Sequence, residues 1–201
     1  MSYTLEIVLI LSSYLLGCLS TGYYLVRLRT GQDIRNLGSG STGTRNVGRF
    51  LGIRGFIITA LGDLTKGIIP VVIALYFEFN IWVVMLVIIA TVAGHIWPIH
   101  LRFKGGRGVV TAAGALIVFD YRIILVAFLI AGLTYVATRR LTLSGLLAIS
   151  LSPAIAVIFR HNIIVIVGIL ALVLIILIAH RSYVRDFLRV IRGRTEKDET
   201  K

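Results

Sequence analysis

Six long apolar stretches dominate this sequence and leave the chain few ways to fold. They cover roughly residues 5–26, 55–77, 80–101, 123–138, 142–159 and 162–179. A helix needs about 20 mostly apolar residues to cross about 30 Å of hydrocarbon, and most of these stretches approach that length. Of the 201 residues, 57% are hydrophobic and only 15% are charged, whereas about 25% are charged in an ordinary soluble domain. We therefore expect an all-α integral membrane protein.

A seventh apolar stretch, Val109–Phe119, is short for a membrane span, and the positions of the basic residues decide its place. If it crosses, nearly all of the 21 Lys and Arg residues lie on one side, in segments 27–54, 102–107, 139–140 and 181–201. If 109–138 were one helix, Arg139 and Arg140 would change sides. Because Lys and Arg gather in cytoplasmic loops, we predict about seven transmembrane helices, an outside N-terminus and a basic cytoplasmic tail, 181–201.

The charge and the cysteine count exclude several classes of protein. The formal net charge of +12 would suit nucleic acid, but the positive-inside bias and anionic head groups explain it in a membrane protein. Membrane lipids are thus expected partners and nucleic acid is not. The single cysteine, Cys18, excludes an internal disulfide, and no His, Cys and carboxylate cluster has metal-ligand spacing. The length fits one domain, 1–201.

A glycine-rich polar loop is expected over residues 28–54, on the cytoplasmic side. Backbone N–H groups at Gly38, Gly40 and Gly43 could approach an anion. The hydroxyl of Ser39, the amide of Asn46 and the guanidinium groups of Arg45 and Arg49 supply further donors. Taken alone, the loop is equally well explained as a flexible linker between two helices.

A second glycine-rich loop follows at residues 102–108, on the same side. Lys104 and Arg107 are interleaved there with Gly105, Gly106 and Gly108, directly before an apolar helix. This arrangement suits a phosphate at a helix N-terminus. A loop that only anchors the chain by positive charge is the alternative, but it would not need consecutive glycines, so we favour anion binding.

Ionisable residues also occur within or next to the apolar stretches. Asp63 and Lys66 lie one helical turn apart. Such groups are costly at membrane depth and usually face the bundle interior, either as a structural pair or as part of a site. His180 ends the last apolar stretch, where an interfacial role is the alternative to catalysis.

Two anion-binding loops on one face of a helical bundle indicate a substrate class. An amphipathic molecule with a phosphate would place its tail among the helices and its head at the loops. Polar groups concentrated at one end favour an interfacial enzyme over a transporter, in which they would be spread through the spans.

Several motifs in this sequence resemble one family. They comprise Gly38-Ser39-Gly40 with Asn46 and Arg49, Asp63 with Lys66-Gly67, Gly94-His95, Phe103-Lys104-Gly105-Gly106-Arg107-Gly108, Thr111 and His180-Arg181. The chain resembles the bacterial acyl-phosphate:glycerol-3-phosphate acyltransferases, the PlsY type. The resemblance runs along most of the chain, and the Phe-Lys-Gly-Gly block is its most specific part.

The resemblance implies a reaction and a set of site residues. It implies transfer of a fatty acyl group from acyl phosphate to the 1-hydroxyl of glycerol 3-phosphate, without a cofactor, in the bacterial cytoplasmic membrane. An enzyme that forms acyl phosphate would then act upstream. The expected catalytic residues are Ser39, Lys104 and His180, and the expected supporting residues are Asp63, Lys66, His95 and Thr111. The expected substrate-binding residues are Gly38, Gly40, Gly43, Asn46, Arg49, Gly105, Gly106, Arg107, Gly108 and Thr142.

The sequence also departs from the usual pattern of that family. Arg45 stands where a Thr is usual, Arg107 where a Lys is usual, Thr142 where a Ser is usual and Tyr183 where an Asn is usual. Two alternatives therefore stay open. One is a divergent paralogue that acylates another acceptor, and the other is a non-catalytic protein that binds or transports anionic lipid.

Overall fold

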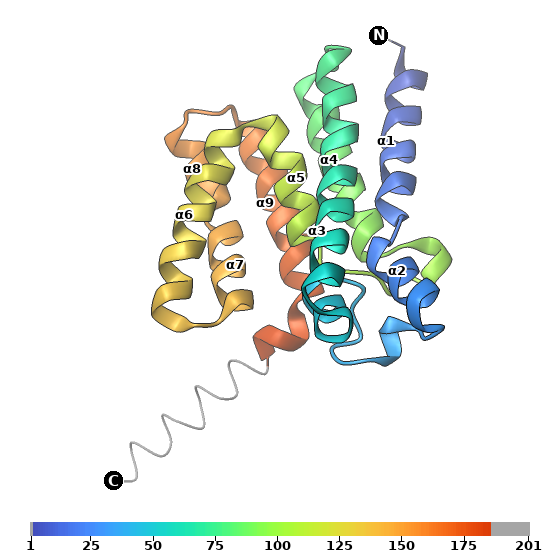
Figure 1. The fold of residues 1–201 in the computed structure, drawn as a ribbon. Helices are drawn as coiled ribbons and strands as arrows, with labels where there is room; N and C mark the ends of the chain where they lie inside the picture. Colours follow the sequence, from blue (N-terminus) through green and yellow to red (C-terminus); the bar gives the residue numbers. More distant parts are fainter. Residues whose placement is uncertain (1, 186–201) are drawn as a thin grey trace.

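The structure, a computed structural model, describes residues 2–185, which form a bundle of helices with no strand among them (Figure 1). The predicted all-α integral membrane class is confirmed. In chain order the elements are α1 (Tyr3–Cys18), α2 (Thr21–Thr30), η1 (Ile34–Asn36), α3 (Thr44–Tyr76), α4 (Ile81–Ile96), η2 (Ile99–Leu101), α5 (Val109–Phe119), α6 (Tyr121–Thr138), α7 (Leu141–Ser150), α8 (Ser152–Ile158) and α9 (Ile163–Ala179).

Among the described residues the chain passes through the bundle as seven rods, namely α1–α2, α3, α4, α5, α6, α7–α8 and α9 (Figure 1). Five helical segments are long and apolar enough to cross a membrane, while α5 and α9 are shorter apolar helices. The predicted break between Val109–Phe119 and the next stretch is confirmed. With 11 residues, α5 is about 16 Å long, and it packs mainly along α3.

The basic loops gather at one end of the bundle. The α6–α7 turn lies at the same end as α2 and the end of α9, whereas the α5–α6 and α8–α9 turns lie at the opposite end (Figure 1). The predicted separation of Arg139 and Arg140 from Arg122 and Arg160 is therefore present. Most of the predicted tail, 181–201, lies outside the described residues.

Two sequence-based boundaries were wrong. The stretch 5–26 is not one helix, because the backbone is extended at Leu19 and the rod restarts as α2. The segment 28–54 is not irregular throughout, because α3 already begins at Thr44. Its polar composition conceals an apolar face, on which Val47 and Leu51 pack in a small cluster with Val26.

Two pairs of helices touch backbone to backbone through glycine. A Cβ atom at Gly17 of α1 would lie 2.1 Å from the carbonyl oxygen of Thr91 on α4, and a Cβ at Gly94 of α4 would lie 2.1 Å from that of Tyr14. Gly67 of α3 and Gly114 of α5 are matched in the same way. Small residues allow such close approach where no hydrophobic force drives helices together in lipid. These two contacts make α1–α4 and α3–α5 the tightest pairs.

A buried ionic cluster lies where these pairs meet. Lys66 Nζ is 2.9 Å from Asp63 Oδ1, and His95 Nδ1 on α4 is 3.5 Å from the same oxygen. Lys66 also donates to the carbonyl oxygen of Leu19 at 2.7 Å. That carbonyl oxygen has no helical partner because the rod breaks there, so Lys66 supplies the hydrogen bond that it would otherwise lack. The predicted pairing of Asp63 with Lys66 is present and joins three rods.

We expect Asp63→Ala to reduce the free energy of unfolding by about 3–5 kcal/mol, because it leaves the buried ammonium of Lys66 without its counter-ion. The apparent Tm of the purified protein in detergent would measure this loss. Replacing both residues, as Asp63→Ala with Lys66→Met, should recover part of it. Leu61→Ala is the matched control, since Leu61 is on the same helix and 59% exposed. Equal Tm values for Asp63→Ala and Leu61→Ala would contradict the expectation.

Candidate active site

The first polar loop is held in shape by the amide of one buried residue. Asn46 Nδ2 donates to the carbonyl oxygens of Leu37 and Ser41, each at 2.9 Å, and Asn46 Oδ1 accepts from the backbone N–H of Ser39 at 3.0 Å. Gly38 has a φ of +55°, and a Cβ there would lie 2.4 Å from Asn46 Oδ1. Asn46 and Gly38 therefore shape the loop that presents Ser39.

The second loop packs on the ring of His95. The backbone N–H of Gly106 donates to the carbonyl oxygen of His95 at 3.0 Å. A Cβ at Gly106 would lie 1.9 Å from His95 Nε2, and one at Gly105 would lie 2.3 Å from the His95 carbonyl oxygen. The consecutive glycines are thus explained by this close approach.

The two loops also bond to one another. The backbone N–H of Thr42 donates to the carbonyl oxygen of Gly105 at 3.3 Å. Arg35, held by Asp33, donates from Nη1 to the carbonyl oxygen of Leu101 at 2.7 Å. The loops predicted separately from the sequence therefore form one assembly.

This assembly forms one wall of a cavity of about 380 Å³. Ser39, Ser41, Arg45, Arg49, Arg107 and His180 contribute polar side chains to its lining. Apolar side chains from α3, α5, α6 and α7 form another part of the lining, among them Phe56, Val110, Phe128 and Leu141. The N-termini of α3, at Gly43 and Thr44, and of α5, at Gly108 and Val109, also reach the cavity. A ligand with an anionic head and an apolar tail fits this division.

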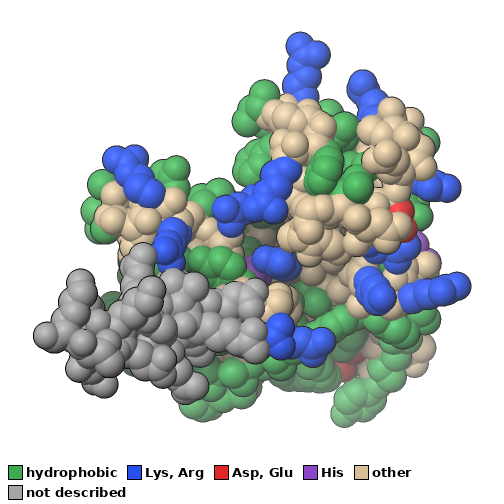
Figure 2. Space-filling view, turned by 90° about the horizontal axis from the view of Figure 1, so that it is seen from below, with side chains coloured by type: hydrophobic (Ala, Val, Ile, Leu, Met, Phe, Trp, Pro, Cys, Tyr) green, Lys and Arg blue, Asp and Glu red, His purple; other side chains and the backbone are tan. Residues whose placement is uncertain are grey.

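Three arginines give the cavity its charge. Arg45, Arg49 and Arg107 all line it, and the ion pairs between described residues include none of them. Burial and the like charges of Arg45 and Arg49 lower the pKa of Arg107. Figure 2 shows Lys and Arg side chains gathered on the face that carries these loops. Three neighbouring cations that have no ion-pair partner among residues 2–185 are suited to binding a phosphate-bearing group.

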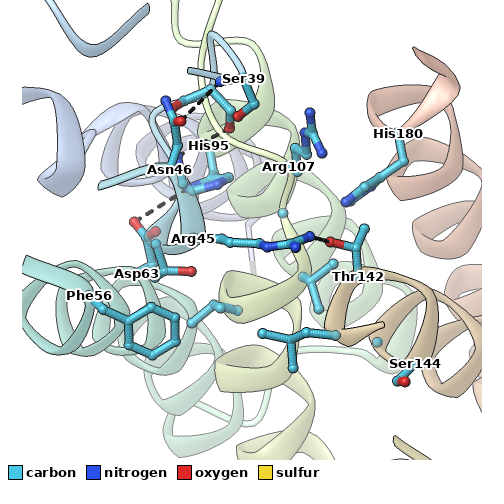
Figure 3. Close-up of a pocket in the computed structure, with 18 of the residues that line it drawn as sticks. Ser39, Arg45, Asn46, Phe56, Asp63, His95, Arg107, Thr142, Ser144 and His180 are labelled. Carbon is cyan, nitrogen blue, oxygen red and sulfur yellow. Dashed lines mark hydrogen bonds and ion pairs between the residues drawn. The ribbon is translucent and has the colours of Figure 1, made fainter. Parts of the chain in front are cut away.

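His180 enters the cavity from the end of α9 (Figure 3). Its Nδ1 atom is 2.9 Å from the carbonyl oxygen of Ile176. Because a carbonyl oxygen can only accept, Nδ1 carries a hydrogen and the neutral ring has its lone pair on Nε2. Burial lowers the pKa of His180. The hydrogen bond to Ile176 partly opposes this shift, and the positive charge of Arg107 adds to it. A neutral imidazole beside an anion site can accept a proton.

The cavity brings together many of the residues expected from the sequence. Those that line it are Ser39, Gly43, Asn46, Arg49, Asp63, His95, Arg107, Gly108, Thr142 and His180. Others lie outside the lining and support it or flank it, namely Gly38, Gly40, Lys66, Lys104, Gly105, Gly106 and Thr111. Lys104 is exposed in the second loop, and Thr111 is buried where α5 meets Gly67. Tyr183 packs against the hydrophobic core and does not line the cavity.

Sequence reasoning gave too little weight to Arg45, which lines the cavity and bonds to Thr142. A signal was available. A basic residue in the first turn of a helix opposes the helix dipole, and Arg45 and Arg49 place two like charges four residues apart. Such a combination is unfavourable unless an anion compensates it. The buried Ser41 and the apolar wall residue Phe56 gave no comparable signal.

A helical membrane bundle with an arginine-lined cavity and apolar walls defines a protein that acts on an anionic amphiphile at the membrane surface. Comparisons with known proteins give the family. The glycerol-3-phosphate acyltransferase family matches residues 7–190. Glycerol-3-phosphate acyltransferase 1 of Desulfitobacterium hafniense is 41% identical over 184 residues, which are 92% of this chain and 91% of that protein. The enzyme of Geotalea daltonii is 38% identical over 184 residues, covering 90% and 93% of the two chains. The chain belongs to the glycerol-3-phosphate acyltransferase family.

Solved structures agree with this assignment. The crystal structure of PlsY (YgiH), an integral membrane glycerol 3-phosphate acyltransferase, in its glycerol 3-phosphate form superposes with a TM-score of 0.86 at 30% identity, over 94% of this chain and 93% of that chain. Its lysophosphatidic acid form gives a TM-score of 0.83 at 28% identity over the same shares.

We expect Gly106→Ala to destabilise the site, because the added methyl group would overlap the ring of His95, which is buried and has little room to move. Overpacking of this kind costs about 1–3 kcal/mol, measured as a lower Tm together with reduced acyl transfer. Gly132→Ala is the matched control, since a Cβ there meets nothing within 4 Å and alanine favours helix. Equal effects of the two substitutions would contradict the close packing of the second loop.

Proposed function

We propose that this chain transfers a fatty acyl group from acyl phosphate to the 1-hydroxyl of sn-glycerol 3-phosphate, giving lysophosphatidic acid and inorganic phosphate. The observation that carries the proposal is the cavity in which Arg45, Arg49, Arg107 and His180 meet apolar walls. Family membership and the PlsY structures with glycerol 3-phosphate and lysophosphatidic acid support the acceptor and the product.

The reaction needs no metal or nucleotide, because acyl phosphate is an activated mixed anhydride. The 1-hydroxyl oxygen forms a bond to the acyl carbon, and the bond from that carbon to the phosphate oxygen breaks. His180 Nε2 accepts the hydroxyl proton and passes it to the departing phosphate. Arg49 and Arg107 stabilise the charge that develops on the carbonyl oxygen and on the phosphate.

Two further residues are proposed to contact substrate at the loops. Ser39 lines the cavity with its backbone fixed by Asn46, so its hydroxyl can orient the acceptor. Lys104 is exposed three residues before Arg107, and its ammonium can bind a phosphate that enters from the aqueous side. Holding both anions in one pocket accelerates transfer by orientation.

The orientation of the chain follows from its charges. We propose a single domain in the bacterial cytoplasmic membrane with the N-terminus outside, since the positive-inside bias assigns the end with the basic loops to the cytoplasm. The cavity then opens toward water-soluble glycerol 3-phosphate. The acyl phosphate comes from a separate enzyme, by phosphorolysis of an acyl thioester or by phosphorylation of a free fatty acid.

The deciding experiment offers purified protein palmitoyl phosphate with glycerol 3-phosphate and measures phosphate and lysophosphatidic acid. Both products should appear in equal amounts, and palmitoyl-CoA should not replace palmitoyl phosphate. Turnover with another acceptor but none with glycerol 3-phosphate would refute the proposal in favour of a paralogue. Full activity of the Lys104→Ala variant would show that Lys104 is not part of the site, and it would leave the rest of the proposal unchanged.

His180 should determine part of the pH dependence. Because its pKa is lowered, the neutral base persists as pH falls through 6.5, and kcat/KM should lose the contribution of His180 only below that value. His180→Gln should reduce kcat by roughly 10²- to 10⁴-fold. The substrate phosphates titrate near pH 6 with either enzyme, so the ratio of the two pH profiles isolates His180. A ratio that is constant with pH would exclude His180 as the base.

A further inference from the structure

Arg45 connects the polar first loop with the apolar helix α7 on the other side of the cavity. The side chain extends from the first turn of α3 to the N-terminus of α7, where Nη1 donates to Thr142 Oγ1. In Figure 3, Ser39, Arg107 and His180 lie on one side of Arg45, and Asp63, Phe56 and Ser144 lie on the other. The guanidinium reaches Thr142, which is next to the apolar lining residue Leu141, so it lies where the polar loops meet the apolar helix α7.

The hydrogen bond to Thr142 orients Arg45 without neutralising it. A hydroxyl group is uncharged, and the bond occupies one of the five N–H donors of the guanidinium. The remaining positive charge adds to those of Arg49 and Arg107; burial, together with the charges of Arg45 and Arg49, lowers the pKa of Arg107. An arginine held in this way is prepared to bind an anion with the donors that are left.

The two substrates of the proposed reaction differ in where their phosphates must lie. In acyl phosphate the phosphate is joined directly to the acyl carbon, so it lies at the boundary between head and tail. Glycerol 3-phosphate has no tail and fits within the polar part, beside Ser39 and His180. Arg45 reaches the start of the apolar helix α7, which suits the phosphate of the tailed substrate, the donor.

We propose that Arg45 binds the phosphate of the acyl donor and that Thr142 positions it for this role. The proposal rests on the proposed function and adds a donor-specific residue to it. Arg45 adds a third guanidinium to the cavity lining beside Arg49 and Arg107.

The test is a comparison of the two KM values in Arg45→Thr. Loss of a charge-assisted hydrogen bond to phosphate should raise the KM for palmitoyl phosphate by about 10- to 100-fold. The KM for glycerol 3-phosphate should change by less than about threefold. Arg54→Ala is the matched control, because Arg54 is an exposed arginine of α3 outside the cavity lining, and it should leave both values as in the wild type.

The role of Thr142 requires a second set of variants. Thr142→Val keeps the size of the side chain but removes the acceptor, so it should raise the donor KM by a smaller factor, about 3- to 10-fold. Thr142→Ser keeps the hydroxyl and should raise it less. In the double variant with Arg45→Thr, the change at Thr142 should have no additional effect, because the arginine that it positions is gone.

Three outcomes would overturn the proposal. Equal increases in both KM values, or a lower Tm with unchanged KM values, would mean that Arg45 only ties α3 to α7. An unchanged donor KM in Arg45→Thr would mean that Arg45 does not touch the donor. In each case the wild-type enzyme still converts palmitoyl phosphate and glycerol 3-phosphate. Absence of that wild-type reaction is the separate result that refutes the proposed function.

Discussion

The position of one buried carboxylate determines much of this structure. Asp63 lies inside the bundle, where its carboxylate forms an ion pair with Lys66 at 2.9 Å and lies 3.5 Å from Nδ1 of His95. Through Lys66, the carboxylate supports the break in the first rod at Leu19. His95, which lies beside the carboxylate, provides the surface on which Gly106 and the second loop pack. The ionic contact that joins the rods therefore lies next to the loop that forms part of the cavity wall.

The residues of the motifs divide between two tasks. Asn46 and Gly106 hold the loops in place, since their amide or backbone groups are engaged within the protein. Arg49, Arg107 and His180 face the cavity and are available to a ligand. A glycine-rich loop that looks like an anion cradle can thus owe its glycines to packing. The cationic side chains and the two helix N-termini that line the cavity are the groups proposed to bind the anion.

Much of the fold could be predicted, and the errors have physical causes. Apolar length and the bias of basic residues gave the number of rods and the end of the bundle at which the basic loops lie, including the separate short helix Val109–Phe119. The break at Leu19 was missed because a lysine 47 residues away satisfies it. The helical start at Thr44 was missed because polar residues conceal the apolar face of Val47 and Leu51. Both errors concern contacts between segments that are distant in the sequence.

The sequence by itself determined that the chain is a helical membrane protein and which loops share one face, because hydrophobic length and charge act locally along the chain. Its motifs also indicated the family. Only the tertiary structure decided which loop residues reach the cavity. Lys104 and Arg107 belong to one motif, yet of these two residues only Arg107 lines the cavity. Arg45 meets Thr142 across 97 residues, a contact set by how α3 and α7 pack, which no local pattern encodes.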